Sequence, residues 1–335
     1  MLLEGLREIG PDGAWTLWGP PASERFCWAG ASLAASTHAP TEWAAQRDAL
    51  SIPDGDIVVW PHAVRPLKRR TSVVLLHDLI PMHWERGAIR RRMWREFLTY
   101  SCRTATTLVV YSEATRTRLA GELGITAGAI VTLPVDPARA STVRSLRADG
   151  IAQDPPFMLY VGQIRPHKNV RRALDAYLAS EFCKRGGAFT IVAGGSSQPE
   201  ELAGIEAVRR GSSTGEIDIL PRLDDLELDR LYASATMVIQ PSFEEGYGLP
   251  VVEALASGIP VCCSDVDALR EAAHGRARLF DPWSVPSITD AIDATASTAG
   301  NEGVSKLHDP LRLPTPAEFA EEFVHLVDVT IRTRR

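Results

Sequence analysis

Residues 244–258 read EEGYGLPVVEALASG and follow an apolar run, TMVIQPS, at 236–242. The run predicts a buried strand, Pro250 fits the first position of a helix, and Gly258 fits the residue after its end. Doubly wound α/β sheets bind ligands where such a strand passes through a turn into a helix. Because the free N–H groups at a helix start favour an anion, this stretch predicts a phosphate site.

Two carboxylates, Glu245 and Glu253, flank the glycine-rich turn. Glu253 falls in the predicted helix, where its carboxylate can accept from both hydroxyls of a vicinal diol such as a ribose. Glu245 precedes the turn and can reach a second hydroxylated group beyond the anion. Two such carboxylates around a phosphate site describe a nucleotide sugar. The alternative is that Glu253 only complements the helix dipole and Glu245 is solvated.

The rest of the 335-residue chain has the same alternation of short apolar runs and amphipathic stretches. It predicts an α/β fold of parallel, doubly wound sheets, and the length predicts two domains. Strands are expected near residues 16, 56, 72, 106, 129, 157, 189, 217, 236, 260 and 278. Helices are expected over 88–103, 113–123, 170–184, 199–210, 224–234, 250–257, 266–273 and 286–298.

The domain plan follows from composition. An N-terminal Rossmann-like domain over 1–140 is followed by a polar, Pro- and Gly-punctuated linker at 141–156 and a C-terminal domain at 157–314. A last helix, 315–335, begins at the cap Thr315 with Pro316 in its first turn, and we expect it to pack on the N-terminal domain.

Composition narrows the function classes. A net charge of −6 gives no indication of nucleic-acid binding. Since no apolar stretch reaches the length of a membrane span and no signal peptide is evident, a cytoplasmic protein is expected. The five cysteines lack metal-ligand spacing, and the adjacent Cys262 and Cys263 are expected to be buried; neither a metal nor a cofactor is predicted.

A second candidate site is YVGQIRPHKN at 160–169. A strand is expected to end at Gly162, and the loop after it carries Arg165, His167 and Lys168. Lysine on such a loop is a point charge suited to a diphosphate, although a solvated surface lysine is the alternative. Asn169 is expected to cap the next helix.

In the first domain, the run SVVLLHDLIP ends a predicted buried strand with His77 and Asp78. His77 is either a site residue or a core histidine with a satisfied ring. Asp78 is expected to hydrogen-bond the loop backbone. His62 is a weaker candidate for the site and is expected to be structural. The basic stretch at 85–97 places Ile89, Met93 and Phe97 on one helical face; it either contacts anionic lipid through 86–97 or is a packed helix with a solvated polar face.

Several of these stretches resemble glycosyltransferase family 4, retaining enzymes of the GT-B fold. The closest likeness is PSFEEGYGLPVVEALASGIPVCCSDVDALREAAHGRARLFDP at 241–282, and the resemblance covers about residues 50–335. Other landmarks follow in family order: HDLIP, YSEATRTRLAGELGI, FMLYVGQIRPHKNVRRALDAY and LYASATMVIQPS.

The resemblance implies two Rossmann-like domains that face each other across a cleft, with the acceptor on the first domain and the donor on the second. Glu253 would hold the donor ribose, and Glu245 the sugar hydroxyls. The implied catalytic residues are His77, Lys168 and Glu245; the implied donor-binding residues are Gly162, Gln163, Arg165, Lys168, Glu245, Gly246, Tyr247, Gly248, Leu249 and Glu253. The chain departs from the family at Gln163 and His167, so Arg165 becomes a candidate for the second phosphate contact.

The expected function is retaining hexosyl transfer, without a metal, from a nucleoside-diphosphate sugar to a hydroxyl of a glycan or glycolipid. The family's first strand and Gly-rich loop have no counterpart at the start of the sequence, LLEGLREIGPDG. That motivates one alternative, a non-catalytic GT-B subunit that binds a nucleotide or a partner. A GT-B nucleotide-sugar epimerase or hydrolase is another.

Overall fold

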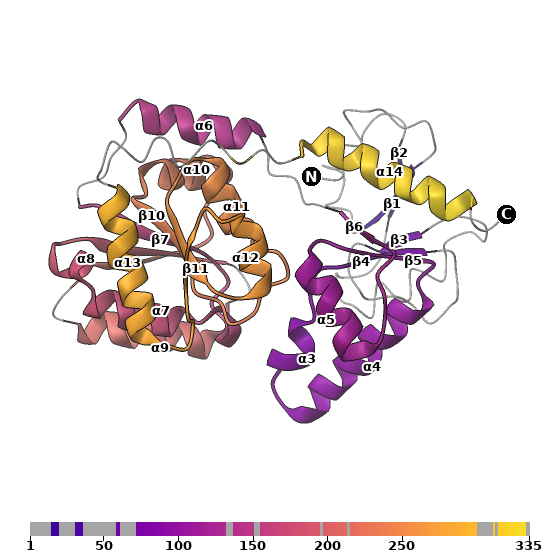
Figure 1. Cartoon of the computed structure of the whole chain (residues 1–335), viewed down its shortest axis with the longest axis horizontal. Coiled ribbons are helices and arrows are strands. Elements are labelled where there is room, and N and C mark those ends of the chain that lie inside the picture. The colour runs from indigo at the N-terminus through magenta and orange to yellow at the C-terminus, as the bar shows by residue number, and fades with distance from the viewer. Residues whose placement is uncertain are drawn as a thin grey trace. The chain divides into compact units, whose positions relative to one another are not determined.

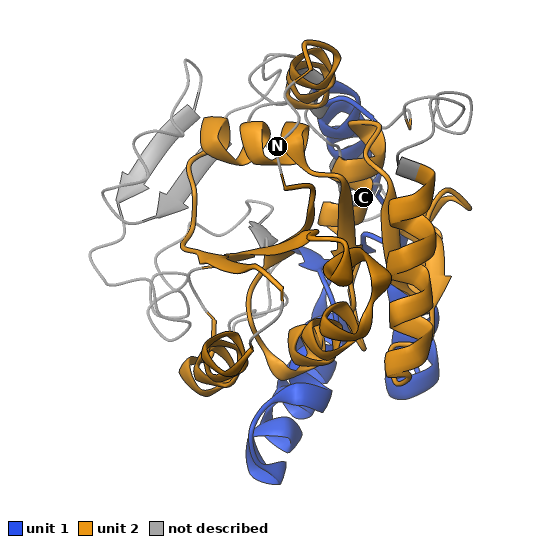
Figure 2. Cartoon of the chain, turned by 90° about the vertical axis from the view of Figure 1, so that its left-hand side faces the viewer, with its two compact units in different colours: residues 1–134, 314–335 blue, residues 135–313 orange. Residues whose placement is uncertain are grey.

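The computed structural model describes residues 15–19, 31–35, 58–60, 72–131, 137–150, 155–194, 197–212, 215–299, 311 and 314–332. The chain divides into two compact units, coloured separately in Figure 2. Unit 1 comprises residues 1–134 and 314–335, and unit 2 comprises residues 135–313. The C-terminal segment therefore belongs with the N-terminal part of the chain.

Unit 2 is built on a six-stranded sheet in the order β12-β11-β10-β7-β8-β9, with every neighbouring pair parallel. The strands are β7 (Phe157–Gly162), β8 (Ala188–Ala193), β9 (Ile217–Leu220), β10 (Met237–Gln240), β11 (Val261–Ser264) and β12 (Arg278–Phe280). The chain first adds β8 and β9 on one side of β7 and then returns to add β10 on the other side. The order thus reverses between β7 and β10, which is where doubly wound sheets bind ligands.

Helices surround this sheet (Figure 1). They are α6 (Pro137–Ala148), the 3₁₀ turn η3 (Pro166–Lys168), α7 (Val170–Ala179), α8 (Glu181–Lys184), α9 (Pro199–Gly211), α10 (Asp225–Ser234), α11 (Leu249–Ala256), α12 (Asp267–Ala273) and α13 (Val285–Ala299). The sheet has a hydrophobic core on each face: Leu159 packs into one cluster, and its neighbours Met158 and Tyr160 pack into the other. Successive strand residues point to opposite faces, so a run that is apolar throughout fills both cores.

Unit 1 contains a four-stranded parallel sheet in the order β3-β4-β5-β6, and a separate parallel pair, β1-β2. Its strands are β1 (Trp15–Gly19), β2 (Ala31–Ala35), β3 (Val58–Trp60), β4 (Ser72–Leu76), β5 (Thr107–Val110) and β6 (Ala129–Ile130). Its helices are α3 (Ile80–Trp84), α4 (Ala88–Thr104), α5 (Glu113–Leu123) and α14 (Pro316–Arg332). The α/β class predicted from the sequence is confirmed.

The expected cap of the last helix is confirmed by two reciprocal hydrogen bonds. The Glu318 backbone N–H donates to Thr315 Oγ1 at 3.1 Å, and the Thr315 N–H donates to Glu318 Oε2 at 2.8 Å. This capping box satisfies two backbone donors at the start of α14. The side chains of Phe319 and Phe323 are buried, as their four-residue spacing predicts.

The structure differs from the sequence-based plan at residues 137–148, where α6 replaces much of the expected linker and belongs to unit 2. This helix has little apolar surface to reveal it: among its described side chains, the buried core residues are Ala140 and Val143. Two arginines hold it instead: Arg144 donates to the carbonyl of Ala256 at 2.6 Å, and Arg147 to those of Ala233 and Ala235 at 3.0 and 2.7 Å. These carbonyls end α11 and α10, where cations stabilise a helix.

None of the helices in the described ranges is long and apolar enough to cross a bilayer. The thiols of Cys102, Cys183, Cys262 and Cys263 are free and buried, as predicted for the adjacent pair. Burial raises the pKa of Cys262 to about 12, so this thiol is protonated and unreactive at neutral pH.

Candidate functional site

The reversal of strand order brings two loops together at the carboxyl ends of β7 and β10. The first loop leads from Gly162 to η3 and carries Lys168; the second follows Gln240 and carries Glu245. Lys168 Nζ donates to Glu245 Oε1 at 2.7 Å, and the two side chains are 17% and 9% exposed. Two residues proposed separately from the sequence therefore form one ion pair.

Glu245 Oε1 accepts two further hydrogen bonds, from Gln240 Nε2 and Ser242 Oγ, both at 2.7 Å. Burial alone would raise the pKa of Glu245, but Lys168 and these donors together lower it below the usual value. The carboxylate is therefore an anion at neutral pH with Lys168 as its counter-ion. The alternative interpretation, that Glu245 is a solvated surface residue, is therefore wrong.

Asn169 ties this site to a third loop. Its Nδ2 donates to the carbonyls of Pro241 and Pro282 at 3.0 and 2.9 Å, and its Oδ1 accepts from Arg172 Nη1 at 3.0 Å. The backbone of Asn169 is left-handed, with φ 55°, and its side chain makes no cap to α7. The expected capping role is wrong, because the amide serves the neighbouring loops instead of the helix.

His167 lies in the same turn and is buried. Burial, and then the charge of Lys168, lower its pKa from 6.5 to about 4. Its imidazole is therefore neutral at pH 7 and adds no positive charge for a phosphate. The backbone carbonyl of His167 accepts from the Phe243 N–H at 2.8 Å, a second link between the two loops. The cations on the first loop are thus Arg165, which is half-buried, and Lys168.

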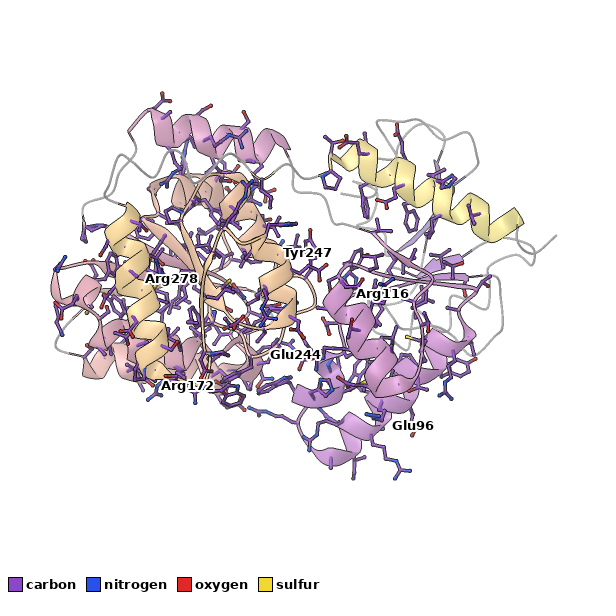
Figure 3. All side chains as sticks on the ribbon, in the orientation of Figure 1. Glu96, Arg116, Arg172, Glu244, Tyr247 and Arg278 are labelled. Atoms are coloured by element: carbon purple, nitrogen blue, oxygen red, sulfur yellow. The ribbon has the colours of Figure 1, made fainter. Side chains whose placement is uncertain are left out.

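The glycine-rich turn has the backbone that its sequence predicts. Gly248 precedes α11 with φ 101°, and a Cβ there would lie 2.7 Å from Leu269 Cδ2. A side chain at 248 is therefore disfavoured by the backbone conformation, and it would also require Leu269 to shift. Gly258 ends the helix with φ 72°, as expected. Gly246 is buried and Tyr247, labelled in Figure 3, is half-buried, with a pKa that burial raises to about 12.

Glu253 lies in the middle of α11 with a side chain that is 26% exposed. Tyr232 Oη donates to its Oε2 at 3.2 Å, and Arg139 Nη1 is 3.8 Å from its Oε1. Burial raises the pKa of Glu253 above its usual value, while Arg139 acts in the opposite direction. The dipole of α11 alone does not describe this carboxylate, which has two named partners.

The remaining predicted donor residues lie on the same two loops. Gly162 closes β7, and its carbonyl accepts from the Gly194 N–H at 2.9 Å. Gln163 is exposed, and its backbone carbonyl accepts from Tyr160 Oη at 2.8 Å. Leu249 is the first residue of α11.

His77 belongs to unit 1, whereas the predicted donor residues belong to unit 2. It follows β4, is half-buried, and its ring centroid lies 4.9 Å from that of Tyr111. Asp78 Oδ1 accepts from the Ile80 N–H at 2.9 Å, which confirms its expected bond to the loop backbone. His62 lies outside the described residues.

The basic stretch forms α4, but Ile89 and Met93 do not pack into a core. They are 79% and 61% exposed, while Leu98 and Cys102 are buried on the same helix. The alternative of a packed helix with a solvated polar face therefore agrees with the C-terminal part of α4, while Ile89 and Met93 lie outside its packed face. Among its arginines, Arg91 donates to the Glu85 carbonyl at 3.0 Å and Arg90 lies 3.5 Å from the Glu85 carboxylate.

Sequence reasoning missed four residues of the site: Gln240, Ser242, Tyr232 and Arg139. The sequence could have indicated Gln240, since a glutamine at the end of an apolar strand lies at the ligand-binding edge of the sheet. Ser242 follows it by two residues. No sequence pattern indicated Arg139 or Tyr232, because they reach Glu253 from other helices.

Known proteins support this architecture. Residues 144–298 match the family model described as Glycosyl transferases group 1. The O-antigen chain mannosyltransferase B of Escherichia coli is 36% identical over 138 residues, 41% of this chain and 35% of that protein. The O-antigen chain mannosyltransferase RfbU of Salmonella typhimurium is 23% identical over 257 residues, 75% of this chain and 67% of that protein. The chain spans 35%, 29% and 28% of the length of three of the curated relatives it matches.

Among solved structures, a glycosyltransferase from Rickettsia africae aligns with TM-score 0.70 at 11% identity, covering 98% of this chain and 93% of that one. Anabaena HepE in complex with UDP-glucose aligns with TM-score 0.68 at 17% identity, covering 98% and 94%. These likenesses show the fold, which is GT-B. The family model covers somewhat less than half of the chain, and within residues 144–298 it supports the resemblance drawn from the sequence.

Proposed function

We propose that this protein transfers a hexosyl group from a nucleoside-diphosphate sugar to a hydroxyl acceptor. The premise is that residues 144–298 match the family model described as Glycosyl transferases group 1. The observation that carries the proposal is the Lys168–Glu245 pair at the strand-order reversal, with Glu253 one helix turn beyond the anion-favouring start of α11.

In this proposal Lys168 and Arg165 neutralise the diphosphate, together with backbone N–H groups at 247–249. Glu253 accepts hydrogen bonds from the ribose hydroxyls, and Glu245 accepts hydrogen bonds from hydroxyls of the sugar. Positive charge held at the leaving diphosphate stabilises the charge that develops as the glycosidic bond breaks. The reaction proceeds with retention at the anomeric carbon and without a metal; chelation by EDTA should leave the rate unchanged.

The ion pair prepares the site for this ligand. Without a ligand, Lys168 and Glu245 neutralise each other, so neither charge is buried alone. A bound diphosphate gives Lys168 a second anionic partner, and sugar hydroxyls give the Glu245 carboxylate further donors. The pair is fixed by Gln240 and Ser242, so little reorganisation is required on binding.

His77 is proposed to act on the reacting sugar from unit 1. His77→Ala should then reduce kcat strongly while leaving nucleotide affinity nearly unchanged. Equal losses of affinity and turnover would assign His77 a structural role, in which its contact with Tyr111 is what matters.

The relatives named above are O-antigen chain mannosyltransferases. On that basis we propose mannose as the first sugar to test and a growing polysaccharide or lipid-linked glycan as the acceptor. The direct assay offers the mannose and glucose conjugates of UDP, GDP and ADP to the purified protein with mannosylated acceptors. Transfer that retains the anomeric configuration supports the proposal.

Other outcomes separate the alternatives. Nucleotide binding without turnover, for every donor and acceptor tried, would indicate a non-catalytic subunit. Conversion of the sugar nucleotide without an acceptor would indicate an epimerase or hydrolase. A folded protein that binds none of UDP, GDP and ADP would overturn the donor site itself.

A lipid-linked acceptor would require contact with a membrane surface, which we propose occurs at the cytoplasmic face through 86–97. The exposed Ile89 and Met93 lie among exposed arginines on α4, a pattern that suits anionic lipid interfaces. Vesicles with and without phosphatidylglycerol test this contact. Ile89→Ser with Met93→Ser should abolish co-sedimentation with anionic vesicles; equal binding by the variant would overturn it.

A further inference from the structure

Glu253 and three other side chains, those of Arg139, Asp229 and Tyr232, form one network. Arg139 Nε donates to Asp229 Oδ1 at 2.5 Å, and Arg139 Nη1 lies 3.8 Å from Glu253 Oε1. Tyr232 donates to the other oxygen of Glu253 at 3.2 Å, and its ring centroid lies 5.7 Å from the Arg139 guanidinium carbon. Arg139 is therefore shared between two carboxylates and an aromatic face.

Arg139 opposes the groups around Glu253 that favour protonation of its carboxylate. Asp229 and Asp225 act to raise the pKa of Glu253, as burial does, whereas Arg139 and the Tyr232 hydroxyl act to lower it. An ionised carboxylate can accept hydrogen bonds at both oxygens from the two hydroxyls of a ribose, whereas protonation turns one of these oxygens into a donor. Arg139 is the cation that favours the ionised form.

The position of Arg139 is set by α6. Arg144 and Arg147 fasten that helix to the carbonyls that end α11 and α10. Glu253 lies on α11, and Asp229 and Tyr232 lie on α10, so α6 presents Arg139 to both helices at once.

The guanidinium is not saturated by these contacts. Its Nη2 is buried and has no hydrogen-bond partner in the described part of the chain, and the 3.8 Å separation from Glu253 exceeds hydrogen-bond distance. A small movement away from Asp229 would bring Arg139 onto Glu253. Asp229 and Glu253 therefore compete for one cation.

We propose that Arg139 is a positioning residue for the nucleotide: it keeps Glu253 ionised and oriented to accept the ribose hydroxyls, and Asp229 limits how strongly it does so. The inference rests on the proposed function in one respect, the identity of the ligand at Glu253. The link between Arg139 and the ionisation of Glu253 does not depend on any ligand.

The first measurement follows Glu253 directly, without a nucleotide. Glutamate labelled with ¹³C at the carboxyl carbon is titrated by NMR in the full chain, and the Glu253 signal is assigned by its loss in Glu253→Gln. Arg139→Gln should move the Glu253 midpoint to higher pH, and Asp229→Asn should move it to lower pH. Unchanged midpoints in both variants would overturn the proposal, whatever the protein binds.

The second measurement compares nucleotide affinity across pH, using whichever of UDP, GDP and ADP the wild-type chain binds most tightly. The ratio of variant to wild-type Kd cancels the titration of the phosphate itself. For Arg139→Gln we expect weakening of about tenfold or more at pH 6, because charge-assisted bonds are worth about 1.5–3 kcal/mol, and a smaller effect at pH 8. Arg139→Lys should restore part of the loss.

Two controls separate positioning from structural damage. The 2′,3′-dideoxy form of the same nucleotide should bind wild type and Arg139→Gln within about twofold of each other, since it lacks the ribose hydroxyls. Arg171→Gln removes an exposed arginine that pairs with Asp175 on α7, away from α6, α10 and α11, so its Kd ratio should not vary with pH. A pH-independent ratio for Arg139→Gln, or an equal loss for the dideoxy ligand, would make Arg139 merely structural. If wild type binds no nucleotide, the proposed function fails, and the NMR titration alone judges Arg139.

Discussion

Lys168 and Glu245 are separated by 77 positions in the sequence, yet Lys168 Nζ donates to Glu245 Oε1 at 2.7 Å. They meet because β7 and β10 are neighbouring parallel strands whose carboxyl ends share one edge of the sheet. The two loops are thus joined by an ion pair whose partners are also the residues proposed to contact the ligand. Removing either partner has consequences for stability as well as for binding.

Replacing Lys168 with methionine tests the contribution of this ion pair to stability. Without its counter-ion the pKa of Glu245 rises, so the variant should be less stable than wild type at pH 7, by about 1–3 kcal/mol. Because Glu245 has a lowered pKa in the native protein, its contribution is present above the unfolded value of 4.5 and is lost as pH falls through the folded value. Urea unfolding at pH 7 and below pH 4 should therefore show a stability difference that shrinks with acid; a constant difference would contradict the pairing.

The two glutamates should respond differently to amide substitution. Glu253→Gln should weaken nucleoside-diphosphate binding about tenfold or more and should barely affect a 2′,3′-dideoxy analogue. Glu245→Gln should leave diphosphate affinity nearly unchanged and weaken only the intact sugar nucleotide. Calorimetric titration of both variants with both ligands tests this, and identical responses would refute the division of roles.

His167 should make the fold sensitive to acid. Its pKa is about 4 in the folded chain and 6.5 in the unfolded chain, so between these values the unfolded state binds more protons. Stability therefore falls as pH drops from about 6.5 to about 4, by on the order of 3 kcal/mol from this residue. His167→Asn, which cannot take up the proton, should give a flatter stability–pH curve by urea unfolding. Parallel curves for variant and wild type would contradict the burial of a neutral imidazole.

Asn169 offers a comparison between two substitutions. Both Asn169→Ala and Asn169→Gly lose the hydrogen bonds to the Pro241 and Pro282 carbonyls, which together should cost about 2–3 kcal/mol. Alanine additionally resists the left-handed backbone, so it should be less stable than glycine by about 1 kcal/mol. This reverses the usual helical preference for alanine. Thermal unfolding that ranks alanine above glycine would show that residue 169 has another conformation.

The sequence predicted most of the regular structure because apolar runs and helix caps are local signals. In unit 2, β7 to β12 lie at the expected runs, and α11 begins at Leu249, one residue before Pro250, and ends at Ala256, shortly before Gly258. The expected helix over 170–184 divides at Ser180, whose side chain accepts from the Cys183 N–H and starts α8. A serine within an amphipathic stretch does not reveal such a break.

What the sequence could not show depended on distant partners. Nothing in the sequence distinguishes Arg139 from the other arginines, because its partners lie on α10 and α11. Ile89 and Met93 share a helical face, and the pattern says that they lie together but not whether anything covers them. Asn169 precedes a helix, which favours a cap, yet its amide is engaged by two loops remote in sequence. Tertiary contacts overrode local preference in each case.

The division of unit 1 into two sequence segments bears on how the chain is synthesised. Residues 314–335 belong to unit 1 but leave the ribosome only after the whole of unit 2, residues 135–313. Unit 2 can therefore complete its sheet during translation, whereas unit 1 must wait for α14, whose Phe319 and Phe323 are buried. Unit 1, whose synthesis begins first, is therefore the later of the two units to be completed.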